Sequence, residues 1–275
     1  MTGTSQVGCS GWEYAEWRGT VYPAEVPKRA WLGWYAEHFG TVEVNGTFYG
    51  LPAATSVARW RDAVPEEFRF ALKLSRFGSH RKHLREPETW LHRFVERAVV
   101  LGERLGPVLV QLPPRWRADP ERLDAFLAEA STHPVPRWAV EVRDPDWLRD
   151  EVYEVLRRHG AALVWHDLLA DHPEEVTAPW LYLRFHGPSA LERPYAGRYP
   201  AAALRRRAAA LRSHLAAGRD VYAYFNNDIG GAAAHDAQVL QRLLRPAAAA
   251  REKDPAPFAR GRDAGYSRPR TTRGT

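Results

Sequence analysis

Residues 41–52 read TVEVNGTFYGLP, a stretch that begins with strict alternation of apolar and polar side chains. Successive side chains of a β-strand point to opposite faces. Val42 and Val44 therefore share one face, and Glu43, Asn45 and Thr47 share the other. Whether these polar groups face solvent or a buried pocket depends on what surrounds the strand.

Seven further stretches resemble strands, and helix-like stretches separate most of them. The predicted strands are 5–11, 41–49, 68–75, 107–114, 137–144, 161–167, 180–187 and 220–227. The predicted helices are 28–39, 55–63, 89–104, 120–130, 147–158, 200–217 and 231–244. Only the connection after 161–167 lacks a convincing helix. Eight strands in about 240 residues predict an α/β fold, a single closed (β/α)8 TIM-like barrel. A doubly wound open sheet is the alternative, but GCSGWEY at 8–14 lacks a dinucleotide-binding fingerprint.

Composition indicates a cytoplasmic protein. The chain has 275 residues, of which 45% are hydrophobic. No apolar run reaches the roughly 18–20 residues that span a bilayer, so no membrane association is expected. The N-terminus shows no secretory signal pattern. The single cysteine, Cys9, excludes an internal disulfide framework and a cysteine-based zinc site.

Most of the basic charge lies in the last thirty residues. The formal net charge is +6, and residues 246–275 hold seven cationic and three anionic side chains, a net of +4. This segment is rich in Arg, Pro and Ala, which predicts a disordered basic tail after a barrel domain at 1–245. Such a tail could contact nucleic acid, although a solubilising extension is the simpler interpretation.

Polar side chains collect where the predicted strands end. In a (β/α)8 barrel these ends form the functional site. Because helices cover the outside of the strands, polar side chains at alternate strand positions must point into the barrel mouth. The candidate catalytic residues are Glu43, Lys73, Glu141 and His186. The candidate substrate-binding residues are Asn45, Tyr49, Arg76, Gln111, Arg143, Asp167, Arg184, Tyr195, Arg198, Tyr199 and Asn226. A structural layer of ion pairs plugging the barrel is the alternative.

The cations at these ends suit an anionic ligand, because guanidinium groups bind phosphate and carboxylate in a bidentate manner. Lys73 could anchor a substrate, form a structural ion pair, or react as a desolvated amine. The amides of Gly230 and Gly231, at a predicted helix start, offer a further anion site. Tyr195 and Tyr199 flank Arg198 in a glycine-containing loop, which is typical of a lid.

We predict no cofactor, with a divalent metal as the alternative. Its candidate ligands are Glu43, Glu141, Asp167 and His186, although the arginines nearby would repel a cation.

Ordered blocks of the chain resemble the YecE-like family, domain of unknown function 72, over residues 6–244. The blocks are VGCSGWEYAEWRGTVYP, WYAEHFGTVEVNGTFYGLP, FALKLSRFGSH, LGPVLVQLPP, AVEVRDPDW, YLRFHG with YAGRYP, and VYAYFNND with GGAAAHDA. Residues 78–80 read GSH where the family pattern has Thr before the His, and the basic tail lies outside the resemblance. The resemblance implies a TIM-like barrel and no established reaction.

These observations predict an enzyme acting on a phosphorylated or otherwise anionic substrate, a nucleotide or nucleic-acid phosphodiester included. In this hypothesis Glu43 or Glu141 is a general base, Lys73, Arg143 and Arg184 hold the anion, and His186 donates a proton. The alternative is a non-catalytic module that binds nucleic acid or a partner through the aromatic, basic mouth and the tail.

Overall fold

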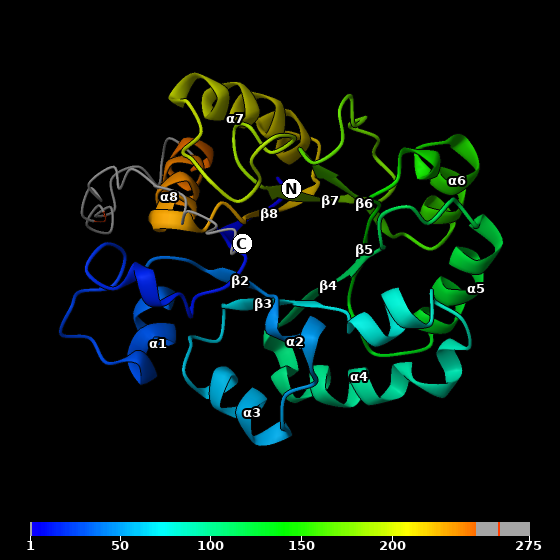
Figure 1. The fold of residues 1–275 in the computed structure, drawn as a ribbon, viewed down its shortest axis with the longest axis horizontal. Helices are drawn as coiled ribbons and strands as arrows, with labels where there is room; N and C mark the ends of the chain where they lie inside the picture. Colours follow the sequence, from blue (N-terminus) through cyan, green and yellow to red (C-terminus); the bar gives the residue numbers. More distant parts are fainter. Residues whose placement is uncertain (1, 246–257, 259–275) are drawn as a thin grey trace, which may run out of the picture.

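The computed structural model describes residues 2–245 and Phe258. The remainder of 246–275, where the disordered tail is predicted, lies outside the described residues. Within the described part, eight parallel strands form one sheet with the order β1-β8-β7-β6-β5-β4-β3-β2 (Figure 1). The sheet curls into a nearly closed barrel with helices outside it, which confirms the predicted fold.

The strands and helices follow one another along the chain as the sequence predicts. The strands are β1 Ser5–Cys9, β2 Thr41–Val44, β3 Arg69–Lys73, β4 Leu105–Gln111, β5 Trp138–Glu141, β6 Ala162–His166, β7 Trp180–Phe185 and β8 Asp220–Phe225. The helices are α1 Trp31–Ala36, α2 Gly46–Tyr49, α3 Ala54–Asp62, α4 Leu91–Ala98, α5 Pro120–Ser131, α6 Asp150–Arg158, α7 Ala201–Ala216 and α8 Ala232–Leu244.

Helix α5 shows how local sequence sets these elements. The Asp119 carboxylate accepts a hydrogen bond from the Arg122 backbone N–H at 3.1 Å, and Pro120 occupies the first turn. Proline is suited to that position because its missing N–H would have no partner inside the helix. Leu123 and Phe126 then turn one face of the helix into the core, as their spacing predicts.

The strand predicted at 41–49 is wrong in its second half. β2 ends at Val44, because the chain turns into α2, where Asn45 already has helical backbone angles. The Thr47 hydroxyl donates to the carbonyl oxygens of Val44 and Lys73. Thr47 therefore links the turn to β3 by a hydrogen bond and does not lie on the strand face that carries Glu43.

The remaining departures from the predicted helices are local. The helix expected at 89–104 divides into α4 and a 3₁₀ segment, Val99–Arg104, in which Gly102 has a positive φ of 57°. The connection between β6 and β7 contains no helix, as expected from its sequence.

The seam between β1 and β2 is closed by a side chain. These strands are the two ends of the sheet order. The buried Tyr35 hydroxyl accepts from the Cys9 backbone N–H at 2.8 Å and donates to the Thr41 carbonyl oxygen at 3.0 Å. A β-carbon on Gly8 would lie 2.2 Å from the same Thr41 oxygen, so only glycine permits this approach. The hydroxyl thus replaces the backbone ladder that would otherwise join the two strands.

The N-terminal half of the barrel is filled with apolar side chains. Small residues such as Ala71 and Ala139 face the aromatic rings of Trp180, Tyr182 and Tyr224. At the N-terminal end of the strands, the Arg137 guanidinium lies over the Trp180 ring and pairs with Asp220 at 2.6 Å. This packing leaves the C-terminal end as the place where polar groups converge.

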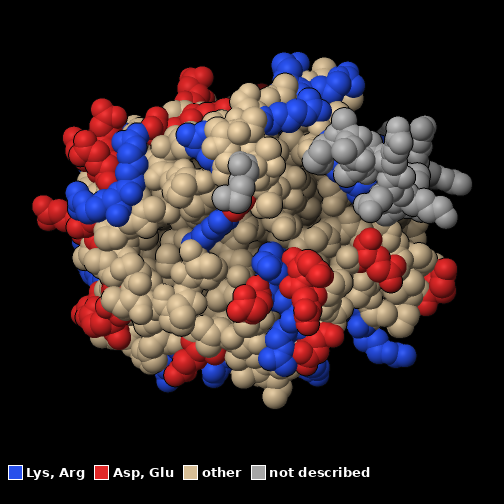
Figure 2. Space-filling view, turned by 180° about the vertical axis from the view of Figure 1, so that it is seen from behind, with Lys and Arg blue, Asp and Glu red and all other residues tan. Residues whose placement is uncertain are grey.

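Two properties of the described part bear on partners. None of its helices is long and apolar enough to cross a membrane. The face seen in Figure 2, behind the view of Figure 1, carries cationic and anionic side chains interspersed, without one continuous basic surface.

Candidate functional site at the C-terminal mouth

Arg184 is the centre of a buried cluster that joins three strands. From β7, its guanidinium Nη2 donates to Glu43 Oε1 on β2 at 2.8 Å, and its Nη1 donates to Glu141 Oε2 on β5 at 2.7 Å. The exposed fraction of these three side chains is at most 1%. The strand alternation had predicted that these groups would meet, and they do.

Neighbouring side chains complete the hydrogen bonds of this cluster. The Tyr182 hydroxyl donates to Glu43 Oε2 at 2.6 Å, and Arg143 donates to Glu141 Oε1. With its amide oxygen toward Arg184, Asn226 accepts from Nη2 at 3.2 Å. Every polar group of Arg184 is therefore engaged, as buried charges require.

Both carboxylates remain ionised. Burial is the largest influence on the pKa of Glu43 and acts to raise it, but the charge and hydrogen bonds of Arg184, together with Tyr182, leave the pKa below its usual value. Burial also acts to raise the pKa of Glu141, and Arg143 and Arg184 hold that pKa well below its usual value. Two carboxylates and two guanidinium groups thus neutralise one another.

Lys73 is a cation that has no carboxylate partner in the described part of the chain, because Glu43 and Glu141 pair with the two arginines. At the end of β3 its ammonium lies 4.3 Å from the centre of the Phe48 ring, and it forms no hydrogen bond or ion pair with the described residues. The side chain is 8% exposed. Burial, and secondarily Arg184, lower the pKa of Lys73 to about 7. The amine is therefore poised between its charged and neutral forms near neutral pH.

Asp228 is a further member of the site that is absent from the predicted site residues. It follows β8, and burial raises the pKa of its carboxyl to about 7, against the lowering influence of Tyr14 and Arg184. Its Oδ1 has no hydrogen-bond partner within the described part of the chain. Of the two helix-start amides expected to hold an anion beside it, that of Gly231 donates to the Asp228 carbonyl oxygen at 3.0 Å.

His186 belongs to a chain of hydrogen bonds rather than to the open mouth. Its Nδ1 lies 3.0 Å from Asp167 Oδ1, and its Nε2 lies 3.3 Å from Arg184 Nη1. The Tyr199 hydroxyl donates to Asp167 Oδ2. Burial lowers the pKa of His186 in spite of Asp167, so the ring is neutral at pH 7. These contacts position His186 against Arg184.

The other predicted site residues lie outside this cluster, and some are buried whereas others are exposed. Asn45 donates to the Ser10 carbonyl oxygen at 3.0 Å, and Gln111 pairs in register with Glu141. Tyr49 and Tyr195 are 74% and 40% exposed, and Arg76 is also exposed. Arg198 contacts His235 at the start of α8, away from the Arg184 cluster.

The residues that sequence reasoning missed are Tyr182 and Asp228. Tyr182 lies two positions before Arg184 in β7, so strand alternation alone could have placed it on the same face. For the alternative of a metal, residues 2–245 with Phe258 contain no group of three or more His, Cys, Asp or Glu side chains arranged to hold one.

This chain is similar to two curated relatives. YecE of Escherichia coli K12, a UPF0759 protein, is 34% identical over 126 residues, which cover 45% of this chain and 46% of YecE. The match thus spans about half the length of that relative. YunF of Bacillus subtilis strain 168, also a UPF0759 protein, is 25% identical over 86% of this chain and 94% of its own.

Solved structures agree with the barrel. A DUF72 family protein of Thermotoga maritima superposes with a TM-score of 0.77 at 26% identity, covering 88% of this chain and 99% of that one. A DUF72 family protein of Enterococcus faecalis gives a TM-score of 0.72 at 25% identity, covering 88% and 95%. The family model described as "protein of unknown function DUF72" matches residues 6–259. This chain therefore belongs to the DUF72 family.

Proposed function

We propose that this protein is an enzyme that binds a small anionic substrate, such as a phosphorylated compound, at the C-terminal mouth of the barrel. The observation that carries the proposal is Lys73, the cation without a counter-ion beside a neutralised cluster. Keeping an uncompensated ammonium largely buried is unfavourable unless a ligand supplies the opposite charge. An anion bound at Lys73 would supply it.

Lys73 and Asp228 are suited to moving protons in this site. Each interacts electrostatically with both Arg184 and Glu43, so they flank the same pair. A pKa of about 7 for both places one proton acceptor and one proton donor near the operating pH, which is where general acid–base catalysis is most efficient. In this proposal Glu43 and Glu141 hold Arg184 in place, and His186 orients it from the other side.

A thermal-shift screen tests the proposal. The purified chain is melted with inorganic phosphate, sulfate, sugar acids, sugar phosphates and nucleotides. A ligand at about one hundred times its dissociation constant adds roughly 2.7 kcal/mol to the free energy of unfolding. We expect at least one small anion to stabilise the wild-type protein and to lose that effect in Lys73→Met.

Lys82→Met is the matched control, because Lys82 pairs with Glu86 on the surface at 2.6 Å. Its response to the anion is expected to equal that of the wild type. If no anion stabilises the protein, or if Lys73→Met responds as the wild type does, the proposal fails.

Exposed apolar side chains favour a second candidate, a module that binds nucleic acid or a protein partner. Among the described residues, six of the seven exposed large apolar side chains lie in the connections after β2, β3, β7 and β8, around the same mouth, and Val99 lies elsewhere. The six are Tyr49, Leu51, Phe77, Leu191, Tyr195 and Ile229. Such side chains can stack on bases or pack on a partner. Single-stranded oligonucleotides in the same screen separate the two candidates. Polyanion binding weakens steeply with salt and, if the tail contributes, with deletion of 246–275.

A further inference from the structure

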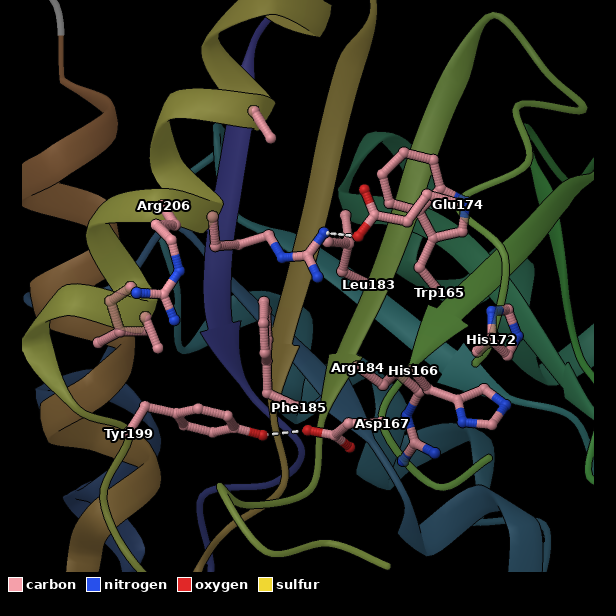
Figure 3. A pocket seen from close by; sticks show the side chains of 14 residues that line it. Trp165, His166, Asp167, His172, Glu174, Leu183, Arg184, Phe185, Tyr199 and Arg206 are labelled. Carbon is pink, nitrogen blue, oxygen red and sulfur yellow. Dashed lines mark hydrogen bonds and ion pairs between the residues drawn. The ribbon is translucent and has the colours of Figure 1, made fainter. Parts of the chain in front are cut away.

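A cavity of about 380 Å³ lies outside the barrel wall, between β6, β7 and α7 (Figure 3). The β6–β7 connection contains no helix, so the outer faces of these strands lack the cover that helices give elsewhere in the barrel. Trp165, Leu183 and Phe185 line the cavity from the strands. They belong to the outer core, whereas Tyr182 belongs to the interior cluster.

Helix α7 contributes the opposite wall with one of its faces. Ala203, Arg206, Arg207 and Ala210 line the cavity at positions i, i+3, i+4 and i+7, which share one side of a helix. The two alanines leave the space open because they carry only a methyl group. The volume falls within the range of about 300–1,000 Å³ typical of small-molecule sites.

The charged side chains around the cavity are paired, with one exception. Arg207 forms an ion pair with Glu174. Asp167 accepts from the His186 N–H, from His186 Nδ1 and from Tyr199. Arg206 is exposed and forms no hydrogen bond or ion pair with the part of the chain that the structure describes. His166, His172 and Arg184 also line the cavity, and His172 Nε2 has no hydrogen-bond partner within the described residues. The cavity therefore combines an apolar side, at Trp165, Leu183 and Phe185, with a polar side that holds one unpaired cation, Arg206.

From this combination we infer a second ligand site, separate from the mouth, for a small amphipathic anion. Its aromatic or aliphatic body packs between Trp165, Leu183 and Phe185, and its anionic group lies at Arg206. Removal of the apolar body from water supplies most of the affinity. The guanidinium selects the charge of the head group.

Fluorescence titration with two dyes tests the inference under conditions where the protein is fully folded. The anionic probe is 8-anilinonaphthalene-1-sulfonate, and the neutral probe is N-phenyl-1-naphthylamine, which has the same rings without the sulfonate. We expect the anionic probe to bind with 1:1 stoichiometry. Ala210→Trp, which fills the cavity, should weaken its binding at least tenfold. Ala209→Trp is the control, because Ala209, unlike Ala210, does not line the cavity although both are exposed on α7.

Arg206→Gln tests recognition of the ligand's anionic group separately. Because Arg206 is exposed, this variant keeps the fold even where Ala210→Trp disrupts it. It should weaken binding of the anionic probe several-fold and leave the neutral probe unchanged, and Arg205→Gln should change neither. The inference is overturned if the anionic probe does not bind, if both tryptophan variants bind it equally, or if Arg206→Gln affects both dyes alike. Variants of Lys73 leave dye binding intact, which distinguishes this site from the mouth.

Discussion

The balance of charge around Arg184 explains why its neighbours remain ionised inside the barrel. Three side chains from β2, β5 and β7 form one unit, and Arg143, Tyr182 and Asn226 complete its hydrogen bonds. A buried pair of this kind adds little net stability relative to apolar packing, but removing one partner leaves an uncompensated charge. The consequences of that asymmetry are measurable at single residues.

Arg184→Met leaves Glu43 and Glu141 buried without their shared partner. We expect the free energy of unfolding at pH 7 to fall by about 3–5 kcal/mol, measured by urea denaturation. Adding Glu43→Gln and Glu141→Gln removes the stranded charges and should recover part of the loss. A loss below about 1 kcal/mol in the single variant would show that the cluster is not a coupled unit.

The pKa of Lys73 makes anion binding depend on pH. The ammonium form binds an anion better than the neutral amine does, and the free protein loses this proton as the pH rises through about 7. Sulfate affinity should therefore be constant below pH 6 and fall by up to about tenfold per pH unit above pH 7. Isothermal titration calorimetry measures this, with sulfate chosen because it does not itself titrate in the range. A profile that is flat to pH 9 would contradict the assignment.

At the scale of secondary-structure elements, the junction between β1 and β2 is the most vulnerable part of the barrel wall. Tyr35→Phe leaves the buried Cys9 N–H and Thr41 carbonyl without the hydroxyl that joins them. We expect a loss of about 1–3 kcal/mol in unfolding free energy and faster hydrogen exchange at the Cys9 amide. Tyr153→Phe is the control, because the Tyr153 hydroxyl forms no hydrogen bond within the described residues. Equal effects in the two variants would show that the hydroxyl does not close the seam.

Strands and helices whose side chains follow a regular apolar–polar period could be predicted from the sequence. Element ends that depend on the backbone conformation of one turn could not. Strand alternation placed Glu43, Glu141 and Arg184 together, because a side chain on a covered strand has only two directions to point. The same reasoning overextended β2, since nothing in the alternation shows that Asn45 adopts helical angles and starts α2. The unpaired state of Lys73 depends on distances between three strands, which local patterns do not contain. The raised pKa of Asp228 comes from burial, which local sequence patterns do not contain either.

At the scale of the whole molecule, a residue beyond α8 contacts the barrel. The Phe258 ring lies 5.6 Å from Trp34 and 6.0 Å from Phe39, measured between ring centres, and both partners belong to the α1 region. The family model also extends to residue 259. Phe258 thus packs on the barrel from beyond residue 245, and the domain boundary at 245 stays a prediction.

Truncation tests how far the stable unit extends. A chain ending at 259 should melt as the full chain does, and one ending at 245 should lose about 1 kcal/mol because the half-buried phenyl ring is removed. Phe258→Ala in the full chain should reproduce the second result. Identical melting of all these proteins would place the end of the stable unit at α8.

The central claim is that Lys73 is an uncompensated amine that titrates near pH 7, and nuclear magnetic resonance can measure that pKa directly. The chain has four lysines, Lys28, Lys73, Lys82 and Lys253, so ¹³Cε-lysine labelling gives a spectrum of four signals. Lys73→Met identifies one of them. We expect this signal to titrate near pH 7, and a bound anion to raise the pKa of Lys73. Titration of the Lys73 signal near the ordinary lysine value of about 10.4 would contradict this claim.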